Sequence, residues 1–142
     1  MTRCVDTSVI ISLLTEEDTS HAAIAWLRER LPDELAATAW LWPELQAGMA
    51  RKVRTQRLSQ QMCQQALSRF DASIAPALAV LAVQPEDFQA AAQMCSVAAT
   101  GIRAGDALHL AVASRNGLPL ATFDKQLARC AEMLGQAVEL IA

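Results

Sequence analysis

The chain has 142 residues, of which 53% are hydrophobic and 19% are charged, and its formal net charge is −3. This composition excludes disorder as the main state, because disorder needs low hydrophobicity and high net charge. The length fits one domain spanning residues 1–142. No apolar run reaches the ~18 residues of a membrane span. The negative charge at first argues against a nucleic-acid partner, since proteins that bind polyanions are usually basic.

The cysteines and the N-terminal region indicate a cytoplasmic location. Cys4, Cys63, Cys95 and Cys130 lie among apolar neighbours and form no Cys-x-x-Cys pair. We interpret them as small hydrophobic residues in a reducing compartment. The apolar run at residues 9–14 is too short for the core of a signal peptide.

Short apolar runs alternate with longer amphipathic ones along the chain. We expect strands and helices in this order: strand 4–5, helix 7–14, helix 22–31, strand 35–39, helix 43–54, helix 59–70, strand 78–83, a helix from residue 85, helix 106–115, strand 118–122, helix 127–134 and strand 138–141. This alternation is typical of βαβ units and a parallel sheet. The strands lack polar alternation, which indicates that both faces of the sheet are covered.

Apolar spacing predicts which side chains the amphipathic helices bury. In helix 22–31 they are Ile24, Leu27 and Leu31, and Pro32 and Asp33 are expected to end that helix. For helix 59–70 and the helix from residue 85, the predicted inward residues are Met62, Cys63, Ala66, Leu67 and Phe70, then Phe88, Ala91, Ala92, Cys95 and Ala99.

Four acidic residues are expected at one edge of the sheet. Asp6 ends the first strand and Asp124 follows a later one, and the carboxyl ends of parallel strands meet at one edge. Glu44 and Asp106 lie where helices begin, which is the same edge in βα units. Each acid alone could cap a helix. Asp106, however, lies among small apolar residues, where an unpaired carboxylate is costly.

A cluster of four carboxylates favours a metal site. Two carboxylates about 4 Å apart repel by about 4 kcal/mol at an effective dielectric constant of about 20, and a bound divalent cation removes that repulsion. Ligands that are all oxygen suit Mg²⁺ or Mn²⁺ rather than zinc. Such a site performs phosphoryl transfer.

Other functions of a small acidic α/β domain fit the sequence less well. A glycosidase also uses paired carboxylates, but no sugar-stacking aromatic residues follow the strands. A phospho-receiver needs an acidic pair after its first strand, whereas that strand ends with the single Asp6, and the run at 79–83 ends in Gln84. A catalytically silent binding module with the same fold remains as an alternative.

Four stretches, taken together and in order, resemble the PIN-domain ribonucleases, in particular the VapC-type toxins of bacterial toxin–antitoxin pairs. They are VDTS at 5–8, PELQAG at 43–48, RAGDALHLA at 103–111 and ATFDK at 121–125. The resemblance implies a three-layer α/β/α sandwich around a mainly parallel sheet. It also implies an endoribonuclease that a cognate antitoxin holds in check and that binds DNA only through that antitoxin.

The resemblance further implies that Asp6, Glu44, Asp106 and Asp124 bind Mg²⁺ or Mn²⁺ and act in RNA cleavage. Thr7 and Thr122 lie next to this set and are expected to orient neighbouring carboxylates. Gln126 stands where some relatives carry a further acid, which leaves open whether one or two ions bind.

Four cations in seven residues form a basic cluster, Arg51, Lys52, Arg54 and Arg57. Arg51, Arg54 and, more loosely, Arg57 share one helical face. This face is either solvated or in contact with RNA phosphates, which set affinity and salt dependence rather than sequence choice.

Several residues near the acids have two interpretations. Arg103 precedes Asp106 by three residues and either pairs with it or binds RNA. His109 lies in so apolar a helix that we expect a buried, hydrogen-bonded, structural side chain rather than a general base. Trp40 and Trp42 flank the segment before Glu44, and at least one of them is a candidate for stacking on RNA bases or for a partner surface.

The apolar surplus of the chain also predicts a homodimer with an apolar interface. If the four acids bind metal, they leave 11 of the 15 acids against 12 Lys and Arg, so the rest of the protein is nearly neutral. RNA would then be held mainly by the metal and by local contacts.

Overall fold

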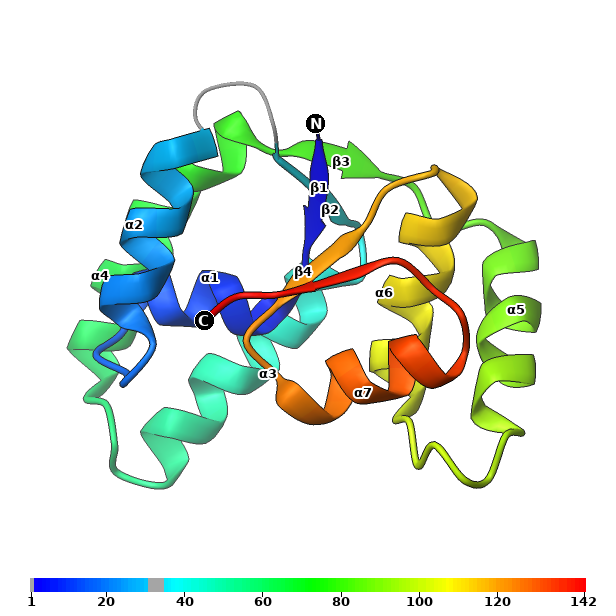
Figure 1. The fold of residues 1–142 in the computed structure, drawn as a ribbon. Helices are drawn as coiled ribbons and strands as arrows, with labels where there is room; N and C mark the ends of the chain where they lie inside the picture. Colours follow the sequence, from blue (N-terminus) through cyan, green and yellow to red (C-terminus); the bar gives the residue numbers. More distant parts are fainter. Residues whose placement is uncertain (1, 31–34) are drawn as a thin grey trace.

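The computed structural model describes residues 2–30 and 35–142, which form a parallel sheet with helices on both sides (Figure 1). The strands are β1 (Arg3–Val5), β2 (Leu35–Thr38), β3 (Ala79–Leu81), β4 (Leu120–Thr122) and β5 (Val138–Leu140). Their order across the sheet is β3-β2-β1-β4-β5, and every neighbouring pair is parallel. The prediction of an α/β fold with a parallel sheet is confirmed.

The helices lie close to the predicted ranges. They are α1 (Thr7–Leu14), α2 (Ser20–Arg30), α3 (Leu41–Arg54), α4 (Gln60–Arg69), α5 (Pro85–Cys95), α6 (Ala104–Arg115) and α7 (Lys125–Met133), with a π-helical turn η1 (Phe70–Ile74) and a 3-10 turn η2 (Ala75–Ala77) between α4 and β3. Leu31, which was predicted to be inward, lies outside the described residues. So do Pro32 and Asp33, which were predicted to end that helix.

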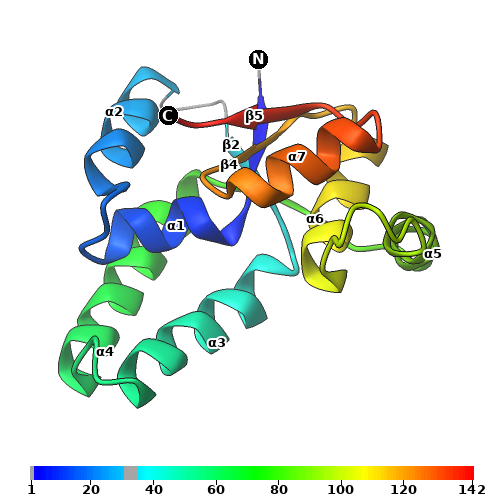
Figure 2. The same cartoon turned by 60° about the horizontal axis from the view of Figure 1, so that its bottom comes forward.

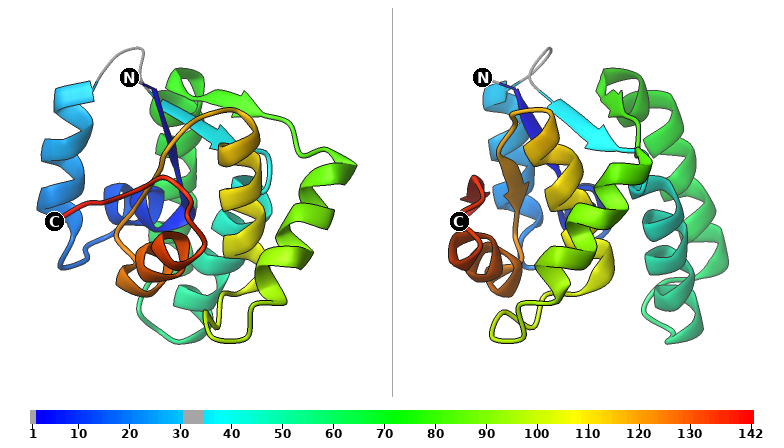
Figure 3. Two further views of the ribbon diagram at one scale, coloured as in Figure 1. Left: turned by 45° about the vertical axis from the view of Figure 1, so that its right-hand side comes forward. Right: turned by 90° about the vertical axis from the view of Figure 1, so that its right-hand side faces the viewer.

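Neighbouring residues of the inner strands face opposite sides of the sheet, as the period of a strand requires. Val5 and Ala121 pack with residues of α1, α3 and α4, whereas Cys4 and Leu120 pack with residues of α6 and α7. Figure 3 shows α3 and α4 side by side, away from α7. The predicted three-layer α/β/α arrangement is therefore present.

Helix α6 is apolar on nearly every side because it is enclosed by the sheet and α5. All of its residues from Ala107 to Ala113 are buried, as predicted. Gly117 then adopts a φ of 68°, which glycine tolerates without steric cost, and returns the chain to β4. None of the helices in the described ranges is long and apolar enough to span a membrane.

Of the residues predicted to be inward on and after α5, Ala91 is buried, but the other four are exposed. Phe88 is 56% exposed, and Ala92 and Cys95 are also exposed, as is Ala99 beyond the helix. Asp87 is buried instead.

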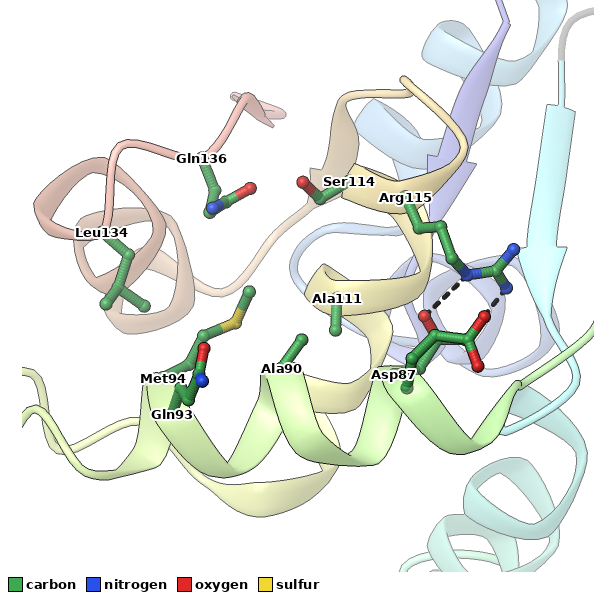
Figure 4. A pocket seen from close by; sticks show the side chains of 10 residues that line it. Asp87, Ala90, Gln93, Met94, Ala111, Ser114, Arg115, Leu134 and Gln136 are labelled. Atoms are coloured by element: carbon green, nitrogen blue, oxygen red, sulfur yellow. Dashed lines mark hydrogen bonds and ion pairs between the residues drawn. The ribbon is translucent and has the colours of Figure 1, made fainter.

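The cause is an ion pair between α5 and α6 (Figure 4). The Arg115 guanidinium donates to both carboxylate oxygens of Asp87, at 2.7 and 2.9 Å. Asp87 also accepts the backbone N–H of Gln84. Because its charge is paired and its oxygens are hydrogen-bonded, the Asp87 side chain can be buried.

Three other apolar side chains predicted to be inward are exposed. Ile24 and Met62 face outward, and Val80 on β3 is 57% exposed because β3 is an edge strand. In α2 the buried aromatic residue is Trp26, whose indole N–H donates to Glu139 at 2.9 Å. This bond turns a different face of α2 toward the core.

Candidate active site

Asp6 lies directly after β1, where it caps α1, and it is 4% exposed. One carboxylate oxygen accepts the Ser8 hydroxyl at 2.6 Å and the Val9 backbone N–H at 3.4 Å. The other oxygen accepts the Thr122 hydroxyl at 2.6 Å. Burial raises the pKa of Asp6, although these hydrogen bonds oppose the shift. The carboxylate is thus fixed in the interior at the end of the strand.

Asp124 caps α7 two residues after β4. Its Oδ1 accepts the backbone N–H groups of Gln126 and Leu127 at 2.9 and 3.1 Å. Oδ1 of Asp124 is therefore occupied in capping α7. The backbone N–H of Asp124 donates to the Thr122 hydroxyl at 2.9 Å. Thr122 consequently connects the backbone of Asp124 with the carboxylate of Asp6.

Glu44 lies in the first turn of α3 and faces both α1 and α6. Its Oε1 accepts the Thr7 hydroxyl at 2.7 Å and contacts Nε2 of His109. Burial alone would raise the pKa of Glu44, but its contact with His109 and its hydrogen bond from the Thr7 hydroxyl lower it overall. The Thr7 hydroxyl thus restrains Oε1 of Glu44.

Asp106 lies in the first turn of α6. Burial raises the pKa of Asp106, and the charges of Asp6, Glu44 and Asp124 raise it further. The resulting pKa is about 6. Figure 2 shows the first turns of α1, α3, α6 and α7 around one region. In the described ranges, no Lys or Arg forms an ion pair with Asp6, Asp106 or Asp124.

His109 is buried and hydrogen-bonded, as predicted, but it bonds to a candidate site residue. It is 0% exposed, and its Nδ1 lies 2.8 Å from the hydroxyl of Thr38 on β2. Its Nε2 contacts Glu44 and lies 3.5 Å from the Thr7 hydroxyl. The sequence contains one signal for this role: His109 follows Asp106 by three residues, which places both on one side of α6.

Gly105 and Trp40 lie beside the other oxygen of Glu44. A Cβ atom at Gly105 would lie 2.6 Å from Oε2 of Glu44 and 3.0 Å from Nε1 of Trp40. A larger residue would therefore displace the carboxylate. The buried Trp40 N–H makes no hydrogen bond of good geometry with the described residues, yet it favours the ionised form of Glu44 and lowers its pKa. Trp42 packs edge-on against Phe70.

The arginines proposed to contact RNA do not form one cluster beside the four acids in the part of the chain described. Arg51 and Arg54 are exposed in the second half of α3, about 10 and about 15 Å of helix beyond Glu44 at about 1.5 Å per residue. Lys52 is taken up by an ion pair with Glu17. Arg103 is exposed before α6 and, among the residues described, does not pair with Asp106. It lines a small cavity with Asp106 and Asp124.

The donor set fits a hard divalent cation in an open site. All four carboxylates are oxygen donors, and three of them lack a cationic partner in the described ranges. Among residues 2–30 and 35–142, no group of three or more His, Cys, Asp or Glu side chains is arranged so that together they could hold a metal ion. Mg²⁺ usually keeps several waters and takes one or two protein carboxylates, so an open arrangement suits it.

Comparison with known proteins identifies similar folds over nearly the whole chain. The PIN domain family model matches residues 3–133. FitAcB from Neisseria gonorrhoeae is 25% identical, with 96% of each chain covered and a TM-score of 0.75. VapBC-5 from Mycobacterium tuberculosis, a member of the VapBC family of toxin–antitoxin systems, is 25% identical, with 99% of this chain and 97% of that chain covered and a TM-score of 0.63.

A further similar structure is VapC20 from Mycobacterium tuberculosis, described as a toxin that cleaves the sarcin-ricin loop. It is 15% identical, with 90% of this chain and 94% of that chain covered and a TM-score of 0.69, so this likeness concerns the fold. No curated protein matches the chain in sequence.

Proposed function

Because the chain belongs to the PIN domain family, we propose that it is a metal-dependent endoribonuclease and the toxin of a toxin–antitoxin pair. The observation that carries the proposal is the electrostatic state of Asp106, whose pKa rises to about 6 through burial and the charges of three other acids. Carboxylates crowded in this way without a Lys or Arg partner, in the part of the chain described, are ready to bind a cation.

In this proposal Asp6 and Asp106 bind Mg²⁺ or Mn²⁺ directly, and Glu44 and Asp124 act through water or on a second ion. The bound ion would polarise a phosphate oxygen and supply hydroxide from water. Thr122 keeps the Asp6 carboxylate in place. Asp124 has Oδ1 committed to the cap of α7, so Oδ2 is the oxygen that it offers to the site.

We also propose a cognate antitoxin as a partner, with DNA bound only through it, and a homodimer. The antitoxin is supported by the similarity to VapBC-5, which belongs to a family of toxin–antitoxin systems. Exposed apolar side chains such as Val80 and Phe88 support a contact between copies.

The test of the proposed function is RNA cleavage by the purified chain with Mg²⁺ or Mn²⁺ and with excess EDTA. We expect cleavage with either ion, none in EDTA, and recovery when Mn²⁺ is restored. Cleavage that persists in EDTA would contradict the metal-dependent mechanism. RNA binding without cleavage under every condition would favour the silent binding module.

Charge reversal of Arg51 and Arg54 to Glu should weaken RNA binding and flatten its dependence on salt, because each lost phosphate contact lowers the salt slope by about 1. The measurement is an RNA binding titration at several salt concentrations. Reversal of Arg28 and Arg129, exposed on α2 and α7, is the charge-matched control. Equal effects in the two double variants would mean that Arg51 and Arg54 belong to a solvated face.

A further inference from the structure

A series of hydrogen-bonded side chains, mostly buried, runs from Thr38 on β2 through His109 on α6 to Glu44. Thr38 on β2 and His109 on α6 are both 0% exposed, and they lie 2.8 Å apart through Oγ1 and Nδ1. The opposite nitrogen of His109 contacts Oε1 of Glu44. In the described residues, the Thr38 hydroxyl makes no other side-chain hydrogen bond. The direct hydrogen-bond contact of these buried groups with the four acids is therefore the one between His109 and Glu44, in the part of the chain described.

The chemistry of the donors and acceptors fixes the direction of each hydrogen bond in this series. A carboxylate can only accept, so Nε2 of His109 must carry the proton that faces Glu44. Nδ1 of a neutral imidazole is then an acceptor, and the Thr38 hydroxyl donates to it. The Thr7 hydroxyl donates to the same oxygen of Glu44 at 2.7 Å. Both ring nitrogens of His109, the two threonine hydroxyls and Oε1 of Glu44 each have a partner in this arrangement, and the tautomer is assigned from those partners.

We propose that His109 is a positioning residue that, with Thr38 and Thr7, holds Glu44 so that only its Oε2 faces the other acids. Oε1 is occupied by two hydrogen bonds. Oε2 lies against Gly105, the residue that precedes Asp106. Glu44 thus offers one oxygen of fixed orientation to a bound ion or water. The consequence for cleavage rests on the proposed function, whereas the hydrogen-bond network does not.

The network can be tested by NMR of the ring nitrogens, because the chain has two histidines. His21 is exposed on α2 and serves as the internal control. In the full-length, metal-free protein labelled with ¹⁵N-histidine, we expect His109 in the Nε2–H form. Glu44→Gln should shift the His109 ring nitrogens and leave those of His21 unchanged. A His109 in the Nδ1–H form, or one that does not respond to Glu44→Gln, would overturn the proposal.

The functional consequence is tested at Thr38, which does not touch Glu44. Thr38→Val removes the hydroxyl that orients His109 at nearly constant volume, and Thr38→Ser retains it. Loss of a hydrogen-bond partner behind a metal ligand commonly costs about 10–100-fold in metal affinity or activity. We expect Thr38→Val to weaken Mn²⁺ binding, followed by electron paramagnetic resonance, and to lower kcat by that factor. KM for RNA should remain unchanged, and Thr38→Ser should resemble wild type.

A pair of variants at His109 separates positioning from packing. His109→Leu removes both ring nitrogens, whereas His109→Gln retains an amide donor that can reach Glu44. Recovery of Mn²⁺ binding by the Gln variant relative to the Leu variant is expected. Equal binding in these two variants, together with a folded Thr38→Val that binds Mn²⁺ and cleaves as wild type does, would overturn the positioning role.

Failure of the proposed function can be distinguished from failure of this inference. A wild-type protein that cleaves no RNA with Mg²⁺ or Mn²⁺ contradicts the nuclease proposal. In that case the ring-nitrogen spectra and Mn²⁺ binding still decide the role of His109. Cleavage by the wild type with unresponsive ring nitrogens overturns the inference alone.

Discussion

Replacing Asp106 with asparagine is expected to abolish RNA cleavage while making the metal-free protein more stable at neutral pH. Removing a metal ligand forfeits several kcal/mol of transition-state stabilisation. Since each 1.36 kcal/mol is a factor of ten in rate, we expect a loss of about 100-fold or more. Stability should rise because ionised Asp106 is disfavoured by burial and by three neighbouring acids, and asparagine carries no charge.

This gain in stability should depend on pH in a defined direction. The folded-state pKa of Asp106 is about 6, above the value of 3.8 for an unperturbed carboxyl. The folded protein therefore binds a proton that the unfolded chain releases between about pH 4 and pH 6. The resulting contribution to stability is fully present below about pH 4 and is lost as the pH rises through about 6.

Thermal denaturation in EDTA at pH 5 and pH 7 measures this difference. Wild type should lose stability relative to Asp106→Asn as the pH rises between these values. Asp71→Asn, which neutralises an exposed acid on η1, is the control and should change neither cleavage nor this pH dependence. An Asp106→Asn variant that cleaves RNA at the wild-type rate would rule out the assigned role of Asp106.

The location of the acids could be predicted because it follows from local pattern and topology. Apolar runs of strand length indicated a parallel sheet, and the carboxyl ends of adjacent parallel strands necessarily lie together. Asp6 and Asp124 follow β1 and β4, which are neighbours. Thr122, the last residue of β4, reaches Asp6 because both lie on the α6 side of the sheet.

Pairs of residues distant in sequence could not be predicted from periodicity. Asp87 and Arg115 are 28 residues apart, and with their ion pair Asp87 is buried while the neighbouring Phe88 is exposed. His109 and Glu44 are 65 residues apart, so the sequence indicated a buried histidine without its partner. A polar side chain is buried once its hydrogen bonds are satisfied, and a helical pattern contains no information on that partner.

The net charge alone is a weak guide to a nucleic-acid partner for a similar reason. The net charge counts every acid equally. The carboxylates at one end of the sheet, however, interact with one another, and the carboxylates elsewhere do not take part in that interaction. Glu139, for example, is bonded by Arg3 at 2.6 Å and by Arg30 at 3.2 Å and joins β5 to β1 and α2. The distribution of charge, rather than its total, bears on nucleic-acid binding.

Two substitutions of Asp6 should abolish cleavage equally but differ in their effect on folding. Asp6 both caps α1 and accepts the Thr122 hydroxyl. Asparagine keeps an oxygen that can accept the Ser8 and Val9 donors, so Asp6→Asn should remain close to wild type in stability. Alanine loses the cap, which costs about 1 kcal/mol, and leaves buried donors unsatisfied at about 1–3 kcal/mol.

Urea denaturation in EDTA should therefore show Asp6→Ala less stable than Asp6→Asn by about 2–4 kcal/mol, and both variants should fail to cleave RNA with Mn²⁺. Ser59→Ala is the matched control, because Ser59 caps α4 by accepting the Met62 N–H at 3.1 Å. It should lower stability by about 1 kcal/mol without changing cleavage. If Asp6→Asn cleaved RNA at the wild-type rate, Asp6 would be a helix cap and not a metal ligand.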